Sequence, residues 1–273
     1  MKNIKLIMAI VGMLVAGVSF GQKKEAAKTL VVYYSQTSNT KTVAQEIATR
    51  LGADLKEIVP VKPYDGDFQA TISRSMKDRQ EGVTPEIQAL DVDFSKYDVI
   101  FLGYPIWFGT YAPPVETFLS QVDLSGKKLV PFCTFGSGGL DSSVKNLTTK
   151  QPKAQVLPGY GVRAARMKAV PHEVDQFLKA GGFIKGNYTK LDAFPEQHAV
   201  NAEESAIFDK AVDGYPMIHA KAESVAQRTI PGGVEYLFTA KDLGAQQMPS
   251  SGSMKVYVIV LDGQAPEFTQ VVR

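Results

Sequence analysis

The sequence predicts an α/β fold built on a doubly wound parallel sheet, followed by a smaller α+β domain. From residue 29 to about residue 184, short apolar runs alternate with amphipathic stretches, the pattern of strands and covering helices in a parallel sheet. From residue 196 on, one helical segment precedes alternating strands that are joined by turns. A chain of 273 residues, 44% of them hydrophobic, is long enough for two such units and excludes wholesale disorder.

The first unit is expected to hold five strands and the helices between them. Residues 30–34 are β-branched and aromatic, as in a buried strand, and apolar residues from Val43 to Leu51 then recur on one helical face. Pro113 and Pro114 suit the first turn of a later helix. The polar segment 64–87 gives no clear pattern. The expected strands are 30–34, 53–59, 98–103, 128–134 and 155–157, and the expected helices are 40–51, 115–122, 140–147 and 173–180.

A linker at 186–195 is expected to separate a domain at 29–184 from a second domain at 196–273. In the second domain a helix is predicted at 202–212, and one helix on an antiparallel sheet is the expected architecture. Turn residues around Gly232 and at Asp262-Gly263 connect neighbouring strands as hairpins. The predicted strands are 218–228, 234–241, 255–261 and 268–272.

The amino terminus predicts export. Two lysines precede an uncharged apolar run, and small residues stand before a cut after Gly21, as in a secretory signal peptide covering residues 1–21. A retained membrane anchor is the alternative, although the run is short for a bilayer. We therefore expect a periplasmic or extracellular protein with no stable membrane span after removal of the signal.

The charge balance argues against nucleic acid as a partner. The whole chain has 30 basic and 28 acidic residues, and loss of Lys2 and Lys5 with the signal peptide leaves 28 of each. A nucleic-acid binder needs a concentrated basic face, which this balance does not favour. The single cysteine excludes both an intrachain disulfide and a thiolate metal cluster.

The first loop (residues 35–40) predicts an anion site. It follows the first strand and opens a helix, where free backbone N–H groups and the helix dipole favour a negative charge. Ordinary helix capping is the alternative, but so many hydroxyl and amide side chains at the end of the first parallel strand favour a phosphate. The candidate contacts are Ser35, Thr37, Ser38, Asn39 and Thr40.

Two further loops follow the next central strands. The second loop (residues 103–114) is rich in aromatic residues and offers a face for a flat ring, or else fills a core gap or a dimer interface. The third loop (residues 132–139) is rich in glycine, which lets backbone amides approach a ligand closely. The candidate residues are Pro105, Ile106, Trp107, Phe108 and Gly109 in the second loop, and Thr134, Phe135, Gly136 and Gly138 in the third.

Together these loops resemble those of flavodoxins. A strand followed by Ser-x-Thr-x-Asn-Thr is similar to the flavodoxin phosphate loop, although flavodoxins usually carry glycine at the position of Ser38. The Pro-Ile-Trp element at 105–107 matches a flavodoxin subfamily. The resemblance covers residues 29–184 and implies a five-stranded sheet of order 2-1-3-4-5 with non-covalent FMN at the switch point. It also implies the phosphate and ring contacts named above.

The resemblance implies electron transfer, with a redox partner protein or a small-molecule acceptor. No catalytic residue and no metal site is predicted: the three histidines are scattered, and Cys133 is expected to be a small buried hydrophobe. Arg163 and Arg166 are expected to be solvated, or else to meet a substrate anion. Two alternatives stay open: a flavin-dependent reductase of a small acceptor such as a quinone, and a binding module without cofactor.

The second domain resembles cystatins and related small α+β folds. Residues 229–236 stand where cystatins have a Gln-Val-Val-Ala-Gly hairpin, but Thr229 replaces the glutamine and Pro231 interrupts the apolar pair. The resemblance therefore implies only the fold. Three roles of the second domain stay open: a docking module, a lid over the flavin, and a structural appendage.

Overall fold

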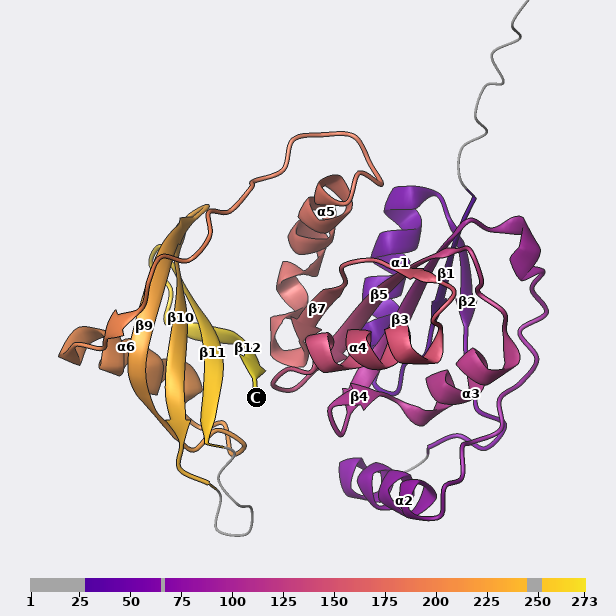
Figure 1. The fold of residues 1–273 in the computed structure, drawn as a ribbon, viewed down its shortest axis with the longest axis horizontal. Coiled ribbons are helices and arrows are strands. Elements are labelled where there is room, and N and C mark those ends of the chain that lie inside the picture. Colours follow the sequence, from indigo (N-terminus) through magenta and orange to yellow (C-terminus); the bar gives the residue numbers. More distant parts are fainter. Residues whose placement is uncertain (1–27, 65–66, 245–251) are drawn as a thin grey trace, which may run out of the picture.

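The chain forms two units, each built on its own sheet, in a computed structural model that describes residues 28–64, 67–244 and 252–273. Figure 1 shows the parallel sheet with its covering helices beside the smaller antiparallel unit. Among the described residues, no helix combines the length and the apolar character that crossing a membrane requires. The predicted signal peptide lies outside these residues.

The first unit has a parallel sheet of order β2-β1-β3-β5-β6. This confirms the predicted order, because β4 only forms a hairpin with β3 and does not count in the parallel series. The strands are β1 (Thr29–Tyr33), β2 (Asp54–Glu57), β3 (Val99–Trp107), β4 (Thr110–Tyr111), β5 (Lys128–Phe135), β6 (Gln155–Val156) and β7 (Tyr160–Arg163). The helices are α1 (Asn39–Leu51), α2 (Phe68–Gln80), α3 (Pro113–Gln121), α4 (Leu140–Lys150) and α5 (Val170–Ala180), with short 3₁₀ turns η1 (Phe94–Lys96) and η2 (Ala164–Ala169).

Both faces of this sheet are covered. Ile47 of α1 and Val174 of α5 pack in one buried cluster with Phe101 of the central strand. Phe118 of α3 and Leu147 of α4 pack in a second cluster on the opposite face. Because adjacent side chains of a strand point to opposite faces, the unbroken apolar run of β3 serves both clusters, as expected of a central parallel strand.

The structure departs from the predicted elements in three places. Strand β3 continues to Trp107, so the first residues of the second loop belong to the strand. The residues that follow form a hairpin, in which β4 pairs with the end of β3. The fifth predicted strand is split into β6 and β7, which both pair with β5 in parallel. The polar segment without a pattern contains α2, whose Asp67 side chain caps the helix by accepting from the Ala70 amide.

The second unit is an antiparallel sheet of order β12-β11-β10-β9-β8 with one helix. The four predicted strands are present. A fifth strand, β8, has two residues, which is too short for a strand pattern to be recognised in the sequence. Phe208 of the helix contacts Phe238 of the sheet, with ring centroids 5.2 Å apart. The elements are β8 (His198–Ala199), α6 (Ala202–Val212), β9 (Ala220–Ile230), β10 (Gly233–Asp242), β11 (Ser253–Leu261) and β12 (Glu267–Val272).

The two units meet where β12 lies against the end of β7 and the third loop. Arg163 at the end of β7 donates to the carbonyl of Phe268, and Arg166 forms an ion pair with Glu267 at 3.2 Å. The expectation that these arginines are solvated is wrong, because Arg163 is only 8% exposed and both bind the second unit.

We predict that Gly103→Ala destabilises the first unit by about 1–3 kcal/mol through overpacking. A Cβ at Gly103 would lie 2.2 Å from the ring of Phe132, which is itself buried. Urea unfolding measures the effect. In a Phe132→Leu background, where the ring is gone, the same substitution should cost clearly less; an equal cost in both backgrounds would contradict the steric account.

Candidate functional site

The structure brings the three predicted loops together at the carboxyl ends of β1, β3 and β5. These strands are neighbours and run in parallel, so the segments that follow them emerge at the same edge of the sheet. Specific contacts then join each loop to the other two. The edge lies where the strand order reverses, which is the usual ligand position in open α/β sheets.

The first loop leaves the amino terminus of α1 open. Ser38 is the residue before the helix, its φ is 66°, and its own side chain makes no capping hydrogen bond. This left-handed backbone explains why flavodoxins usually carry glycine here, since glycine adopts it without strain. The first-turn amides of a helix have no partner within the helix, and a phosphate can accept from them.

Side chains of the first loop line this opening. The Lys41 amide donates to Ser35 Oγ at 3.2 Å, which folds the loop back over the first turn. Thr37 and Ser38 are exposed, and Asn39 Nδ2 lies 3.4 Å from Thr37 Oγ1. The donors fit a phosphate monoester: hydroxyls and an amide surround a helix end at which Ser35, and not Ser38, accepts from a backbone amide.

Thr40 and Thr134 connect the first loop to the third. Their hydroxyl oxygens are 2.8 Å apart, and both side chains are buried. One hydroxyl donates to the other, and because both side chains are buried, the backbone groups are the more accessible means by which either residue can reach a cofactor. Phe135 is also buried in the core, so its backbone alone borders the site.

Gln36 and Tyr64 connect the first loop to the second. Gln36 accepts from the Tyr34 hydroxyl at 2.6 Å and donates to the Tyr64 carbonyl at 2.5 Å. The Tyr64 ring in turn meets Trp107 edge to face, with centroids 5.0 Å apart. Burial raises the pKa of Tyr64 to about 12, with nearby Asp78 adding to the shift, so its hydroxyl stays protonated at neutral pH.

The second loop turns at Phe108 and Gly109. Both have positive φ, 52° and 80°, between the paired residues Trp107 and Thr110, as in a two-residue type I′ hairpin. Trp107 is half-buried against Tyr34 and Tyr64. Phe108, by contrast, is 47% exposed. The Arg79 guanidinium lies 6.0 Å from the centroid of this ring. The exposed ring on a left-handed backbone makes Phe108 a candidate ligand contact.

The third loop touches both the second loop and the second unit. A Cβ at Gly139 would lie 2.7 Å from Ile106, and Ser142 Oγ donates to the Gly109 carbonyl at 2.6 Å. A Cβ at Gly138 would lie 2.0 Å from the Val271 carbonyl of β12. Position 138 therefore has to be glycine, because the docked β12 leaves no room for a Cβ. The sequence alone does not show this requirement.

Sequence reasoning missed several residues that hold the site together. Gln36 lies within the first loop, but its hydroxyl-bearing neighbours are the residues that the pattern marks as phosphate contacts. Tyr64 begins the segment 64–87, which shows no apolar periodicity. Cys133, as expected, is fully buried in β5, and burial raises the pKa of its thiol well above the usual value. His198 contacts Glu204 in the second unit at 2.9 Å.

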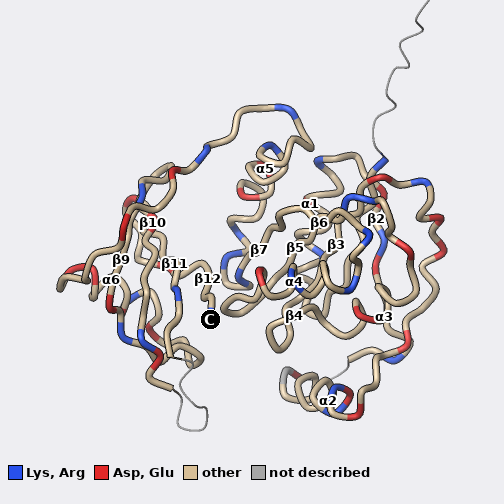
Figure 2. The backbone as a smooth tube through the Cα atoms, viewed as in Figure 1, with Lys and Arg blue, Asp and Glu red and all other residues tan. Residues whose placement is uncertain are grey.

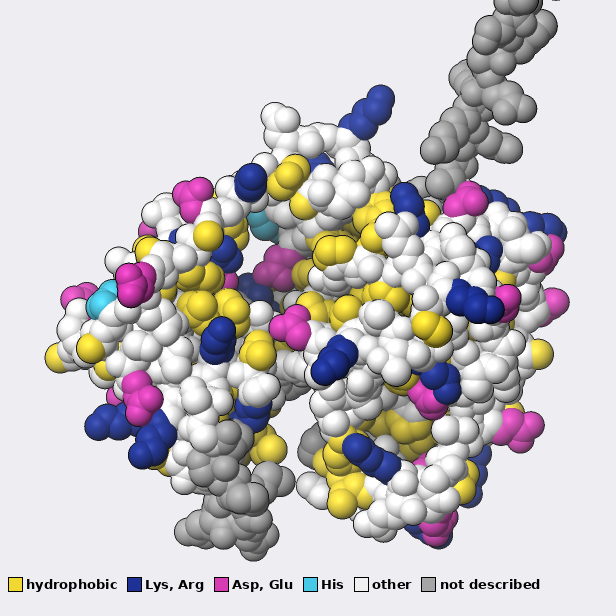
Figure 3. Space-filling model, in the orientation of Figure 1, with side chains coloured by type: hydrophobic (Ala, Val, Ile, Leu, Met, Phe, Trp, Pro, Cys, Tyr) yellow, Lys and Arg dark blue, Asp and Glu magenta, His cyan; other side chains and the backbone are white. Residues whose placement is uncertain are grey.

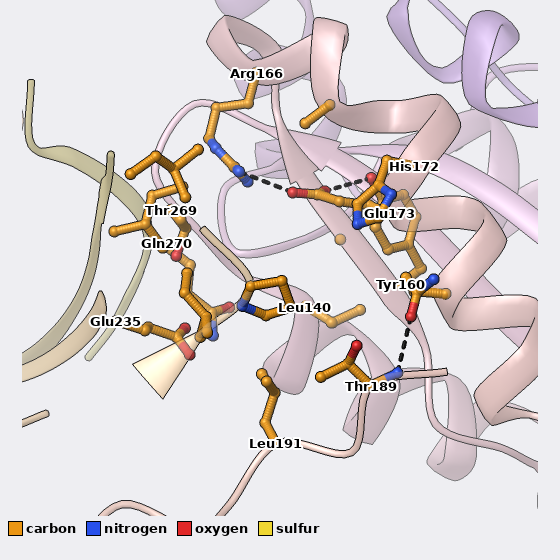
Figure 4. A pocket seen from close by; sticks show the side chains of 17 residues that line it. Leu140, Tyr160, Arg166, His172, Glu173, Thr189, Leu191, Glu235, Thr269 and Gln270 are labelled. Atoms are coloured by element: carbon orange, nitrogen blue, oxygen red, sulfur yellow. Dashed lines mark hydrogen bonds and ion pairs between the residues drawn. The ribbon is translucent and has the colours of Figure 1, made fainter. Parts of the chain in front are cut away.

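A cavity of about 490 Å³ lies between the two units (Figure 4). Figure 3 shows hydrophobic side chains along the hollow that separates them. Arg166 pairs with Glu173 at 2.8 Å, and the Tyr160 hydroxyl donates to the same carboxylate. Apolar lining from both units includes Leu140, Leu191, Ile230 and Leu261.

Comparison with known proteins gives a family and several similar structures. A family model described as Flavodoxin matches residues 28–175, more than half of the chain. A candidate flavoprotein from Bacteroides eggerthii is 31% identical, with 55% of this chain and 96% of that chain covered and a TM-score of 0.48. A flavoprotein from Lactobacillus acidophilus, crystallised in complex with FMN, is 29% identical, with 50% and 93% covered and a TM-score of 0.46.

We predict that Thr40→Val lowers the free energy of unfolding by about 1–3 kcal/mol, because Thr134 is left with a buried unpaired hydroxyl. Thr134→Val should have a similar effect for the same reason. The double variant should cost less than the sum of the two, since valine is close to threonine in shape and no hydroxyl remains. Additive costs in urea unfolding of the FMN-free protein would show that the pair is not coupled.

Proposed function

Because this chain belongs to the flavodoxin family, we propose that its first unit binds FMN through the three loops and transfers electrons. The family confirms the prediction of FMN as the cofactor. The observation that carries the rest of the proposal is that the first and third loops bond to each other directly, while Tyr64 and Ser142 of α4 hold the second loop beside them. Separate surface loops would have no need of such mutual fixation.

The phosphate of FMN is assigned to the first loop. Ser35, Thr37, Ser38 and Asn39 supply side-chain donors, and the first-turn amides of α1, including that of Thr40, supply backbone donors. Hydrogen bonds to an ionised group are the stronger kind, so a dianion can be held here without lysine or arginine.

The isoalloxazine ring is assigned to the second and third loops. Phe108 offers a free aromatic face, while Trp107 is held by Tyr34 and Tyr64 and shapes the floor beside Pro105 and Ile106. A fixed aromatic wall reduces the ordering cost of binding. Gly109 permits the hairpin, and Gly136 and Gly138 leave backbone amides accessible.

Bound FMN would supply one- or two-electron chemistry. The chain's residues bind and orient the ring, and protonated Tyr64 contributes no charge beside it. No catalytic side chain is assigned.

The electron partner is proposed to be a protein or a small acceptor that does not rely on charge for docking. Basic and acidic residues alternate along both units in Figure 2, in keeping with the zero balance of the chain without residues 1–21. Export by the predicted signal peptide, a periplasmic or extracellular location and the cystatin-like fold of the second domain remain parts of the proposal.

The cavity between the units favours the reductase alternative. Leu140, directly after the third loop, is among its lining residues, and the apolar part of its mixed wall suits a small quinone. In that case, reoxidation of the chemically reduced protein by a water-soluble quinone should saturate, and Leu261→Trp should raise the half-saturating concentration by filling the cavity. A rate that rises linearly with quinone in both proteins would contradict this alternative.

Titration with FMN and with riboflavin, which lacks the phosphate, tests the proposed site. We expect the protein to quench FMN fluorescence with saturation at micromolar concentrations. Thr37→Ala should weaken FMN binding about tenfold, the value of one hydrogen bond to an ionised group, and leave riboflavin binding unchanged. Phe108→Ala should weaken both ligands, because it removes a ring contact.

Thr49→Ala is the matched control, because Thr49 is exposed at the opposite end of α1. It should change neither affinity. Absence of saturable FMN binding by the wild-type protein would overturn the proposed function and favour a binding module without cofactor.

A further inference from the structure

Two carbonyl oxygens of the third loop are bound, one by β7 of the first unit and one by β12 of the second unit. Arg163 Nε donates to the Gly136 carbonyl at 2.9 Å, and the Val271 amide of β12 donates to the Ser137 carbonyl at 2.6 Å. The Tyr215 hydroxyl lies 2.7 Å from the position a Cβ would take at Gly136. Two successive peptide groups of the loop are thus fixed, one by Arg163 at the end of β7 and one by Val271 of the second unit.

Arg163 connects the loop to β12 directly. Besides its bond to Gly136, its guanidinium donates to the Phe268 carbonyl at 2.8 Å and lies 3.4 Å from the centroid of the Phe268 ring. Tyr215 is the next aromatic, at 5.5 Å. Burial lowers the pKa of Arg163, but a guanidinium stays charged in proteins. One buried cation therefore bonds to both units.

This grip determines where the amides of the loop point. In a planar trans peptide the C=O and N–H of one unit point in opposite directions. Since the Gly136 carbonyl faces Arg163 and the Ser137 carbonyl faces β12, the amides of Ser137 and Gly138 point away from Arg163 and from β12, respectively. The loop contacts the second unit at Gly138 and the second loop at Gly139.

We propose that Arg163 is a positioning residue through which the second unit holds the amides of Ser137 and Gly138 ready for the pyrimidine edge of the flavin. This rests on the proposed function. FMN binding and docking of the second unit are then coupled, and by linkage each strengthens the other by the same factor. The second unit is in this sense part of the cofactor site.

Paired arginine variants test the role of Arg163. Arg163→Met should weaken FMN binding about tenfold, within the range usual for coupled sites. Arg166→Met is the matched control, because Arg166 also bridges the units through Glu267 but does not contact the third loop. It should change FMN affinity less than threefold. Arg163→Lys keeps the positive charge but loses the planar guanidinium group, so its FMN affinity should lie between those of the two methionine variants.

Hydrogen exchange of backbone amides distinguishes coupling to FMN from a merely structural role of Arg163. FMN should slow exchange of the Val271 amide in the wild-type protein, and this effect should be lost in Arg163→Met. The Tyr236 amide, in β10 within the second unit, is the internal control and should not respond. Thermal unfolding and far-UV circular dichroism of both variants confirm that each is folded.

The outcomes separate the two proposals. If wild-type protein binds no FMN, the proposed function fails. If it binds FMN, but the two methionine variants have equal affinity or the Val271 amide does not respond to FMN, the coupling is overturned and the proposed function stands.

Discussion

The buried contact between Thr40 and Thr134 is the constraint on which the edge of the sheet depends. It joins the first turn of α1, the helix that follows β1, to the end of β5, and β1 and β5 are the two neighbours of β3. Because both hydroxyls are buried, losing either partner leaves a polar group unpaired, so the distance between the first and third loops is narrowly determined. The second loop, extending from β3, is held on one side by Tyr64, whose carbonyl accepts from Gln36, and on the other by Ser142.

Local pattern explains how much of this arrangement the sequence predicts. The strands and covering helices of the first unit follow from apolar periodicity, and the first loop follows from hydroxyl residues after a buried strand. Helix α2 escapes detection because its residues are mostly polar, and β8 because it has two residues. The split of the fifth strand depends on how residues 157–159 pass between β6 and β7, which periodicity does not encode.

Contacts between distant segments explain the rest. Arg163 is 105 residues from Phe268, so no local signal marks it as buried, and a charged residue at a strand end is ordinarily solvated. The loop sequence predicts that Gly138 lets the backbone approach a ligand, but the docked β12 gives a second reason for a glycine at this position. The exposure of Phe108 also depends on its place at the hairpin turn.

The position of β12 in the chain bears on the order in which this edge is completed. The third loop leaves the ribosome well over a hundred residues before the strand that binds its Ser137 carbonyl. Until then that carbonyl is hydrated, and the guanidinium of Arg163, which binds the Gly136 carbonyl, lacks the ring of Phe268 over it. Since domains tend to fold as they emerge, maturation of the loop must wait for a segment made much later. Premature termination before β12 would thus yield an assembled parallel sheet with one of its three loops unfastened.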